Sequence, residues 1–166
     1  IIVEPGYGVG VEYRTHIQSK GWEKTWKKDG ETSGTSGEAK RLEAINIVIV
    51  PKGANPGVAT SKTFVSAYPG SINYKTHVQT FGWQGNENDA KTWFTNGAMA
   101  GTSGKAKRLE GIKIRVTGND NLGIQYTTHC QSYGWLPWSA NGEMNGTEGE
   151  AKRLEAIKIQ LTGSDA

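Results

Sequence analysis

Histidine, tryptophan and cysteine are the residues of this 166-residue chain best suited to chemistry or ligand binding, and it has three, six and one of them. Each histidine stands six positions before a tryptophan. A second tryptophan follows, three residues ahead of an Asp-Gly or Asn-Gly pair. An indole beside a short carboxylate or amide can bind a sugar, because the ring stacks on the apolar C–H face while the polar group bonds the hydroxyls.

The two tryptophans of each set differ in their spacing. The first (Trp22, Trp83, Trp135) keeps a fixed distance from its histidine and follows a glycine, which predicts an indole locked in the core. The second follows a connection of variable length, which predicts an indole nearer the surface. A threonine in the next loop adds a polar group. We predict three related ligand sites, each with a tryptophan, an Asp or Asn and a threonine: Trp26, Asp29 and Thr35; Trp93, Asn96 and Thr102; Trp138, Asn141 and Thr147. The alternative is that these tryptophans pack between repeats while Asp and Asn only permit the turn.

Two roles are open to the histidines, His16, His77 and His129. Each could donate a hydrogen bond to a ligand hydroxyl, or each could clamp a neighbouring strand or the glutamate of a recurring Arg-Leu-Glu segment. We favour the clamp, because residues that organise every copy must recur, whereas ligand residues can change between copies. No carboxylates cluster beside the histidines, so we expect no metal site and no cofactor.

The Arg-Leu-Glu segments open at Arg41, Arg108 and Arg153. On strict alternation Arg41 and Glu43 share the face of Ile45, Ile47 and Ile49. Charges at that place must be paired, so we predict a structural ion pair or a cap on the end of the core. Acid–base hydrolysis needs a second carboxylate at a fixed separation. None recurs, so we predict no catalytic residue and no enzyme activity.

The lone Cys130 stands in register with Ile17 and Val78. A cysteine at such a position behaves as a small buried hydrophobe, and we predict that role over a nucleophilic one. One cysteine also excludes an internal disulfide and a cysteine-based metal cage.

Three copies of one unit account for these spacings, over approximately 7–50, 70–118 and 122–163, with an insertion at 51–69. The opening and closing segments of each unit alternate in hydrophobicity, as half-buried strands do. Residues 38–45 could start a helix by propensity, but the β-branched residues that follow at period two favour a strand. A unit of about 45 residues cannot bury its apolar face alone. We therefore predict one all-β, pseudo-threefold domain over 1–166, β-prism-like, with a β-trefoil as the alternative.

Composition excludes several partners. The net charge is only +3, too small to indicate a nucleic-acid groove, and the basic cluster of Lys24, Lys27 and Lys28 occurs only in the first unit. No apolar run has the length of a membrane span, so we expect no membrane insertion. The glycine-rich G-x-x-x-G-T-x-G loops lack the Lys-Ser/Thr of a phosphate-binding loop and indicate β-turns. The chain begins without Met or a visible export signal, and we expect it to be a processed piece.

The combination Y-x-T-H-x-Q-x-x-G-W, W-x-x-(D/N)-G, G-T-x-G and R-L-E-(A/G)-I resembles the clostridial hydrophobic repeat with its tryptophan, the ChW repeat. The resemblance implies a module of an exported or surface protein of Gram-positive bacteria, with carbohydrate or surface macromolecules as ligands. Two features depart from it: Cys130, and a lengthened loop at 85–91. We predict a non-enzymatic module, secreted or at the cell surface and part of a larger multidomain protein, with lectin-like binding of glycans at up to three related sites. The alternative is a protein–protein adhesion or anchoring module.

Overall fold

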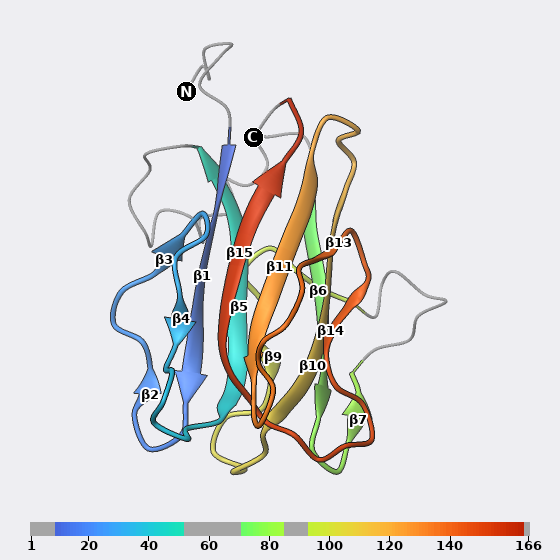
Figure 1. Cartoon of the computed structure of the whole chain (residues 1–166). Coiled ribbons are helices and arrows are strands. Elements are labelled where there is room, and N and C mark those ends of the chain that lie inside the picture. The colour runs from blue at the N-terminus through green and yellow to red at the C-terminus, as the bar shows by residue number, and fades with distance from the viewer. Residues whose placement is uncertain (1–8, 52–70, 85–92, 165–166) are drawn as a thin grey trace.

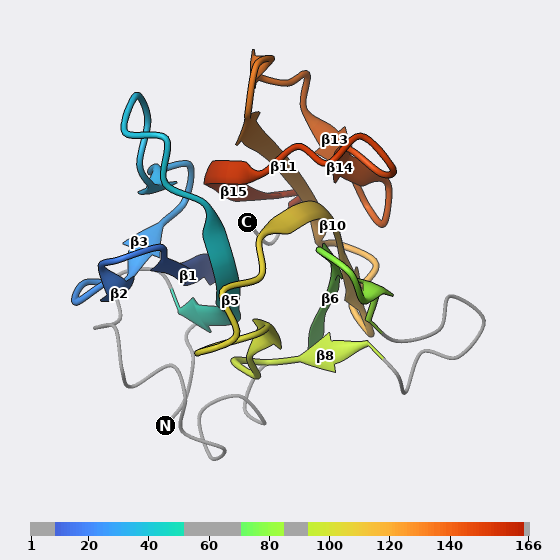
Figure 2. The same cartoon turned by 90° about the horizontal axis from the view of Figure 1, so that it is seen from below.

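The computed structural model describes residues 9–51, 71–84 and 93–164, and this part of the chain is all-β. It forms three five-stranded antiparallel sheets, one for each repeat, arranged around a common centre (Figures 1 and 2). Each sheet is built on two long strands: β1 (Val9–Ile17) with β5 (Leu42–Pro51), β6 (Ser71–Val78) with β10 (Leu109–Thr117), and β11 (Gly123–Cys130) with β15 (Leu154–Thr162). Three separate sheets around an axis confirm the predicted pseudo-threefold, prism-like fold, and residues 38–41 form no helix.

Short strands complete each sheet. The first tryptophan lies in β2 (Gly21–Trp22), β7 (Gly82–Trp83) or β12 (Gly134–Trp135), which turns back on the opening long strand. The second tryptophan immediately precedes β3 (Lys27–Lys28), β8 (Phe94–Thr95) or β13 (Ser139–Ala140), which pairs with the same long strand further along. The predicted insertion at 51–69 lies outside the described residues, apart from Pro51 at the end of β5.

The third set of short strands joins the repeats in a ring. These strands are β4 (Ser33–Gly34), β9 (Ala100–Gly101) and β14 (Met144–Gly146). None pairs within its own repeat: β9 pairs with β5 of the first repeat, β14 with β10 of the second, and β4 with β15 of the third. The glycine-rich loops predicted as turns therefore also supply an edge strand to a neighbouring sheet.

Three buried tyrosines reinforce this exchange. The Tyr74 hydroxyl accepts a hydrogen bond from Ile47 N (3.2 Å) in the first repeat and donates one to Ala98 O in its own. Tyr126 makes the same pair of bonds, with Ile114 N (3.1 Å) and Glu143 O, and Tyr13 makes them with Ile159 N (3.1 Å) and Glu31 O. Each phenol thus satisfies a backbone amide of the preceding repeat, which would otherwise be buried without a partner.

A bulge in each closing strand changes which side chains reach the core. Ile17 lies opposite Leu42, and His16 lies opposite Ala44, so Glu43 is the extra residue. The register shifts at the same place in the other two sheets. Leu42 and Ile45 both enter the core as a result, and the Glu43 carboxylate bonds His16 on the outer face. The prediction that Glu43 shares the face of Ile45 is wrong, because strict alternation fails at a bulge.

The shared core contains the inward residues of all three repeats, including Tyr13, Tyr74 and Tyr126. Cys130 lies in it with no exposed surface, alongside Ile17 and Val78, which confirms the predicted hydrophobic role. Burial raises the pKa of the Cys130 thiol, so the group stays protonated and unreactive near neutral pH.

We expect the whole domain to unfold in a single cooperative transition. Because each sheet takes its edge strand from a neighbouring repeat, no repeat can form a complete sheet alone. Thermal melts followed by circular dichroism and by tryptophan fluorescence should coincide, and the calorimetric and van't Hoff enthalpies should agree. A fragment that holds only residues 122–163 should be unfolded. Separate transitions, or a folded fragment, would count against the exchange.

Candidate ligand-binding site

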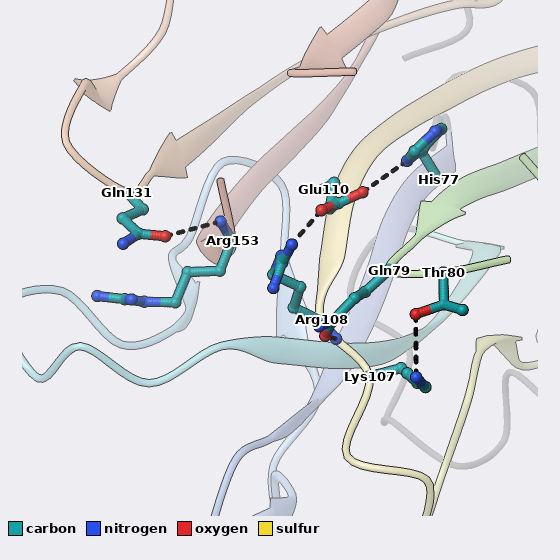
Figure 3. Close-up of polar contacts among 8 residues, drawn as sticks. All are labelled: His77, Gln79, Thr80, Lys107, Arg108, Glu110, Gln131 and Arg153. Atoms are coloured by element: carbon teal, nitrogen blue, oxygen red, sulfur yellow. Dashed lines mark hydrogen bonds and ion pairs between the residues drawn. The ribbon is translucent and has the colours of Figure 1, made fainter. Parts of the chain in front are cut away.

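The histidines form an ion-pair clamp at the end of each sheet. His77 Nδ1 lies 2.9 Å from Glu110 Oε1, and Arg108 Nε donates to Glu110 Oε2 at 2.8 Å (Figure 3). The same arrangement joins His16, Arg41 and Glu43 in the first repeat and His129, Arg153 and Glu155 in the third. Each glutamate uses both carboxylate oxygens and is buried by its neighbours. The predicted clamp and ion pair are confirmed.

Glutamine side chains extend this clamp to the backbone. Gln131 Oε1 accepts a hydrogen bond from Arg153 N at 3.2 Å, and Gln79 Oε1 accepts one from Arg108 N at 3.3 Å (Figure 3). These bonds fasten the turn after each opening strand to the start of the closing strand. The arrangement is structural, because its polar atoms are paired with one another.

The first tryptophan of each repeat lies on the outer face of its sheet rather than in the core. Trp22, Trp83 and Trp135 pair directly opposite the outward-facing histidines. The His77 and Trp83 rings, for example, are 5.3 Å apart and meet edge-on at 81°. The prediction of a core position is wrong, because residues opposite one another in a ladder share a face and the histidines face outward.

The second tryptophan of the first two repeats is covered. Trp26 and Trp93 are only 8% and 7% exposed, which contradicts the predicted surface position. Each lies against a cation from the opening strand: the Arg14 guanidinium is 5.0 Å from the ring centres of both Trp22 and Trp26. Lys75 Nζ takes the same place, 5.9 Å from Trp83 and 4.9 Å from Trp93. A side chain of the protein thus fills the slot between the two indoles by cation–π contact.

The third repeat differs, and its second tryptophan is exposed. Thr127 stands where Arg14 and Lys75 stand in the other repeats, and its hydroxyl donates to Leu136 O. This side chain is too short to lie between two indoles. Trp138 is therefore 46% exposed and Trp135 37% exposed, with Lys158 Nζ 4.5 Å from the Trp135 ring centre. Of the three predicted sites, this is the one at which the described structure presents an open indole pair.

The Asp and Asn residues of the predicted sites hold turns. The Oδ1 atoms of Asp29, Asn96 and Asn141 accept hydrogen bonds from Val11 N, Ile72 N and Ile124 N at 2.9, 3.1 and 2.9 Å. All three have positive φ, at 33°, 44° and 44°, which Asp and Asn tolerate better than most residues. The turn role that was the alternative prediction is the one observed.

The threonines of the predicted sites lie beside the neighbouring sheet. The backbone N–H groups of Thr35, Thr102 and Thr147 donate to Glu155 O, Glu43 O and Glu110 O at 2.9, 2.9 and 2.8 Å. Their hydroxyl oxygens are shielded from solvent. Within each repeat, the tryptophan, the Asp or Asn, and the threonine of the predicted site therefore contribute to three different parts of the fold. Ligand contact by these nine residues stays a prediction, and Trp138 is the one whose ring is available for it.

The sequence contains a signal for this difference that does not lie in the spacing of the tryptophans. The residue after the strand tyrosine is Arg14, Lys75 or Thr127, and only the first two can cover an indole. Lys158 on the facing strand is the other neighbour of the exposed pair that spacing alone did not single out.

Residues 9–51, 71–84 and 93–164 contain neither a cluster of metal ligands nor a membrane-spanning helix. Nowhere in these ranges do three His, Cys, Asp or Glu side chains gather closely enough to hold a metal ion. The same ranges contain no helix with the length and apolar character needed to cross a membrane.

Comparison with known proteins agrees with the repeat structure. The family model described as Clostridial hydrophobic W matches the chain three times, over residues 16–51, 77–118 and 129–163. These matches begin at His16, His77 and His129 and end within or just after the closing strands. No curated protein and no solved structure matches the chain. Because the three matches together cover more than half of its length, the chain belongs to the Clostridial hydrophobic W (ChW) family, with three copies of the repeat.

Proposed function

We propose that this domain is a non-enzymatic binding module of a larger secreted or cell-surface protein, and that it binds glycans through the third repeat. The observation that carries the proposal is the open pair of indoles, Trp135 and Trp138. The other two repeats cover the equivalent pair with a cation of their own.

An exposed indole pair suits a sugar for physical reasons. Each ring offers a flat apolar surface that can stack on the C–H face of a pyranose, and an indole N–H can bond a hydroxyl. Lys158 Nζ lies 4.5 Å from the Trp135 ring centre and supplies a charged donor over that ring, which leaves Trp138 as the more open stacking surface. Such contacts are individually weak, so we expect modest affinity for a single sugar and tighter binding where several copies of the module act together.

A protein partner is the second candidate, and a different observation favours it. Phe81 and Tyr133 are 53% and 51% exposed at the tips of equivalent turns, and Met144 is 38% exposed. Aromatic side chains and methionine are enriched at protein–protein interfaces. Binding to a surface protein, combined with failure on a broad glycan array, would favour this adhesion or anchoring role.

Trp138→Ala should weaken glycan binding about tenfold, because it removes one stacking surface from the ligand site. A glycan array would identify the neutral oligosaccharide that binds the parent, and titration calorimetry would measure the change. Thr127→Arg provides a matched test that keeps both indoles. The new guanidinium should fill the slot as Arg14 does in the first repeat and weaken binding similarly.

Circular dichroism must show that both variants keep the native fold. Arg14→Thr is the reciprocal control: it should uncover Trp26 without affecting binding at the third repeat. If folded Trp138→Ala and Thr127→Arg both bind the oligosaccharide as the parent does, the ligand does not lie on this indole pair.

A further inference from the structure

The first repeat contains a groove that the ligand site of the third repeat does not explain. It has a volume of about 340 Å³ and lies beside the turn that joins β1 to β2, against the crossing strand β4. We define the first-repeat groove by six of its lining residues: Lys20, Trp22, Glu23, Lys24, Lys27 and Gly34. Its lining includes Lys20 and Gly21 of the β1–β2 turn, and this turn lies at one end of the prism (Figure 1).

The acidic residue of the groove is already committed to the fold. Glu23 Oε1 accepts hydrogen bonds from Thr15 N and Thr15 Oγ1, both at 3.2 Å, and from Ser33 Oγ. Glu23 Oε2 accepts one from Gly34 N at 3.3 Å. This carboxylate therefore holds the crossing strand in place, and its single negative charge offsets only part of the charge of the three lysines in the groove wall.

Those lysines are left with positive charge to spare. Lys20 Nζ is paired with Glu38 at 2.8 Å, but both side chains are about half exposed, so the pair is weak. Lys24 and Lys27 form no ion pair with any residue in the described part of the chain. Positive charge concentrated in a concave surface attracts anions more strongly than the same charge on a convex one.

The basic lining is particular to the first repeat. Lys20 corresponds to the exposed Phe81 and Tyr133, and Lys27 corresponds to Phe94 and Ser139. In the third repeat the connection between the tryptophans is Leu136-Pro137, with no lysine. Lys20 and Lys27 have no lysine counterpart in the other copies. Lys24, in Lys24-Thr25-Trp26, has one in Lys91-Thr92-Trp93 of the second copy, so the full set of three lysines occurs in the first repeat only.

We propose that the first-repeat groove binds an acidic sugar residue of an anionic glycan, a second site chemically different from the one in the third repeat. Arg14 covers Trp22 on the side shared with Trp26, so the sugar ring would lie against the part of Trp22 that lines the groove. The carboxylate of the sugar would accept hydrogen bonds from Lys24 and Lys27. Charge-assisted bonds to a carboxylate are stronger than bonds between neutral groups. The inference rests on the assignment of the domain to glycan binding, but it concerns different residues and a different ligand charge.

The test compares an oligouronate with its fully methyl-esterified counterpart, which has the same rings and no charge. Titration calorimetry on the whole domain should show that the parent binds the acid more tightly, and that added salt weakens binding of the acid only. The double variant Lys24→Ala, Lys27→Ala should lose about tenfold in affinity for the acid. The matched variant Lys24→Arg, Lys27→Arg keeps the charge and should retain it.

Each result separates this inference from the proposed function. Trp138→Ala should leave binding of the acid at the first-repeat groove unchanged, while the alanine double variant should leave binding of the neutral oligosaccharide unchanged. The inference is overturned if acid and ester bind equally, or if the alanine double variant binds the acid as the parent does. It is also overturned if a single-stranded oligonucleotide displaces the acid as effectively as more acid does, because the groove would then recognise charge alone.

Discussion

Gly101→Ala should lower the free energy of unfolding by about 3 kcal/mol, because the added methyl group has no room beside the neighbouring sheet. Gly101 lies in β9, the strand that the second repeat lends to the first. Its φ is +94°, and an added Cβ would meet Glu43 O at 2.4 Å and Ala44 Cα at 2.8 Å. Both contacts are with backbone of the neighbouring long strand, which cannot move without breaking its own ladder.

Gly104→Ala is the matched control. Its φ of +77° is similarly unfavourable for alanine, but a Cβ there would meet nothing within 4 Å. The control should cost about 1 kcal/mol, the strain of a left-handed residue alone. Urea unfolding at equal protein concentration would measure both variants. If the two substitutions lower the free energy of unfolding equally, the close approach of β9 to β5 is not the reason that position 101 requires glycine.

The same argument applies to the two equivalent glycines, Gly34 and Gly146. It explains the recurrence of glycine in the G-T-x-G loops, which turn formation alone explains only in part. A Cβ at Gly34 or Gly146 would meet Glu155 O at 2.4 Å or Glu110 O at 2.5 Å. From the sequence, the G-T-x-G loops were predicted to be turns because glycine recurs in them. The first glycine of each is in fact required by a neighbouring sheet, and no local pattern identifies which sheet that is.

Features that depend on local pattern were predictable. The presence of three repeats, the long strands and the buried Cys130 follow from hydrophobic alternation and from register between copies. The pairing of His16 with Glu43 followed from recurrence, because a structural pair must appear in every copy. The sequence could not show the bulge at Glu43, since one extra residue in a ladder leaves no trace in composition.

The exposure of each tryptophan was not predictable from its own neighbours in the sequence. Trp26 and Trp138 occupy equivalent places, each just before a short strand that pairs with the opening strand. Their exposures differ because of residues 14 and 127 on that opening strand, an arginine in one case and a threonine in the other. The predicted exposure of the second tryptophan is therefore observed in only one repeat of three.

Alkaline pH should unfold the domain steeply, because three tyrosines are buried as neutral phenols. Burial raises the pKa values of Tyr13, Tyr74 and Tyr126 above the ordinary 10.0, that of Tyr126 to about 12. The unfolded chain loses these protons near pH 10, while the folded chain keeps them. Stability is therefore fully present below pH 10 and falls as the pH rises from 10 toward 12. Each phenol contributes about 1.4 kcal/mol per pH unit, so the three together give about 4 kcal/mol per unit.

Urea midpoints measured at intervals above pH 10 would give this slope, and phenolate absorbance would report the ionisation directly. Tyr126→Phe should remove about one third of the slope, since one of three buried phenols is gone. Tyr133→Phe is the comparison: this side chain is 51% exposed, and its pKa is raised mainly by its hydrogen bond to Glu150, so its removal should change the slope much less than Tyr126→Phe does. Burial lowers the pKa of Lys75, so this group acts on the pH dependence of stability with the opposite sign. Well above its ordinary pKa of 10.5, Lys75 is neutral in both the folded and the unfolded state and does not affect the slope. The absorbance of Tyr126 is the difference between the parent and Tyr126→Phe, since other tyrosines of the chain, such as the exposed Tyr133, also ionise. If this difference rises while the circular dichroism stays native, the buried hydroxyl ionises in the folded protein, and its hydrogen bonds between repeats are not what resists alkali.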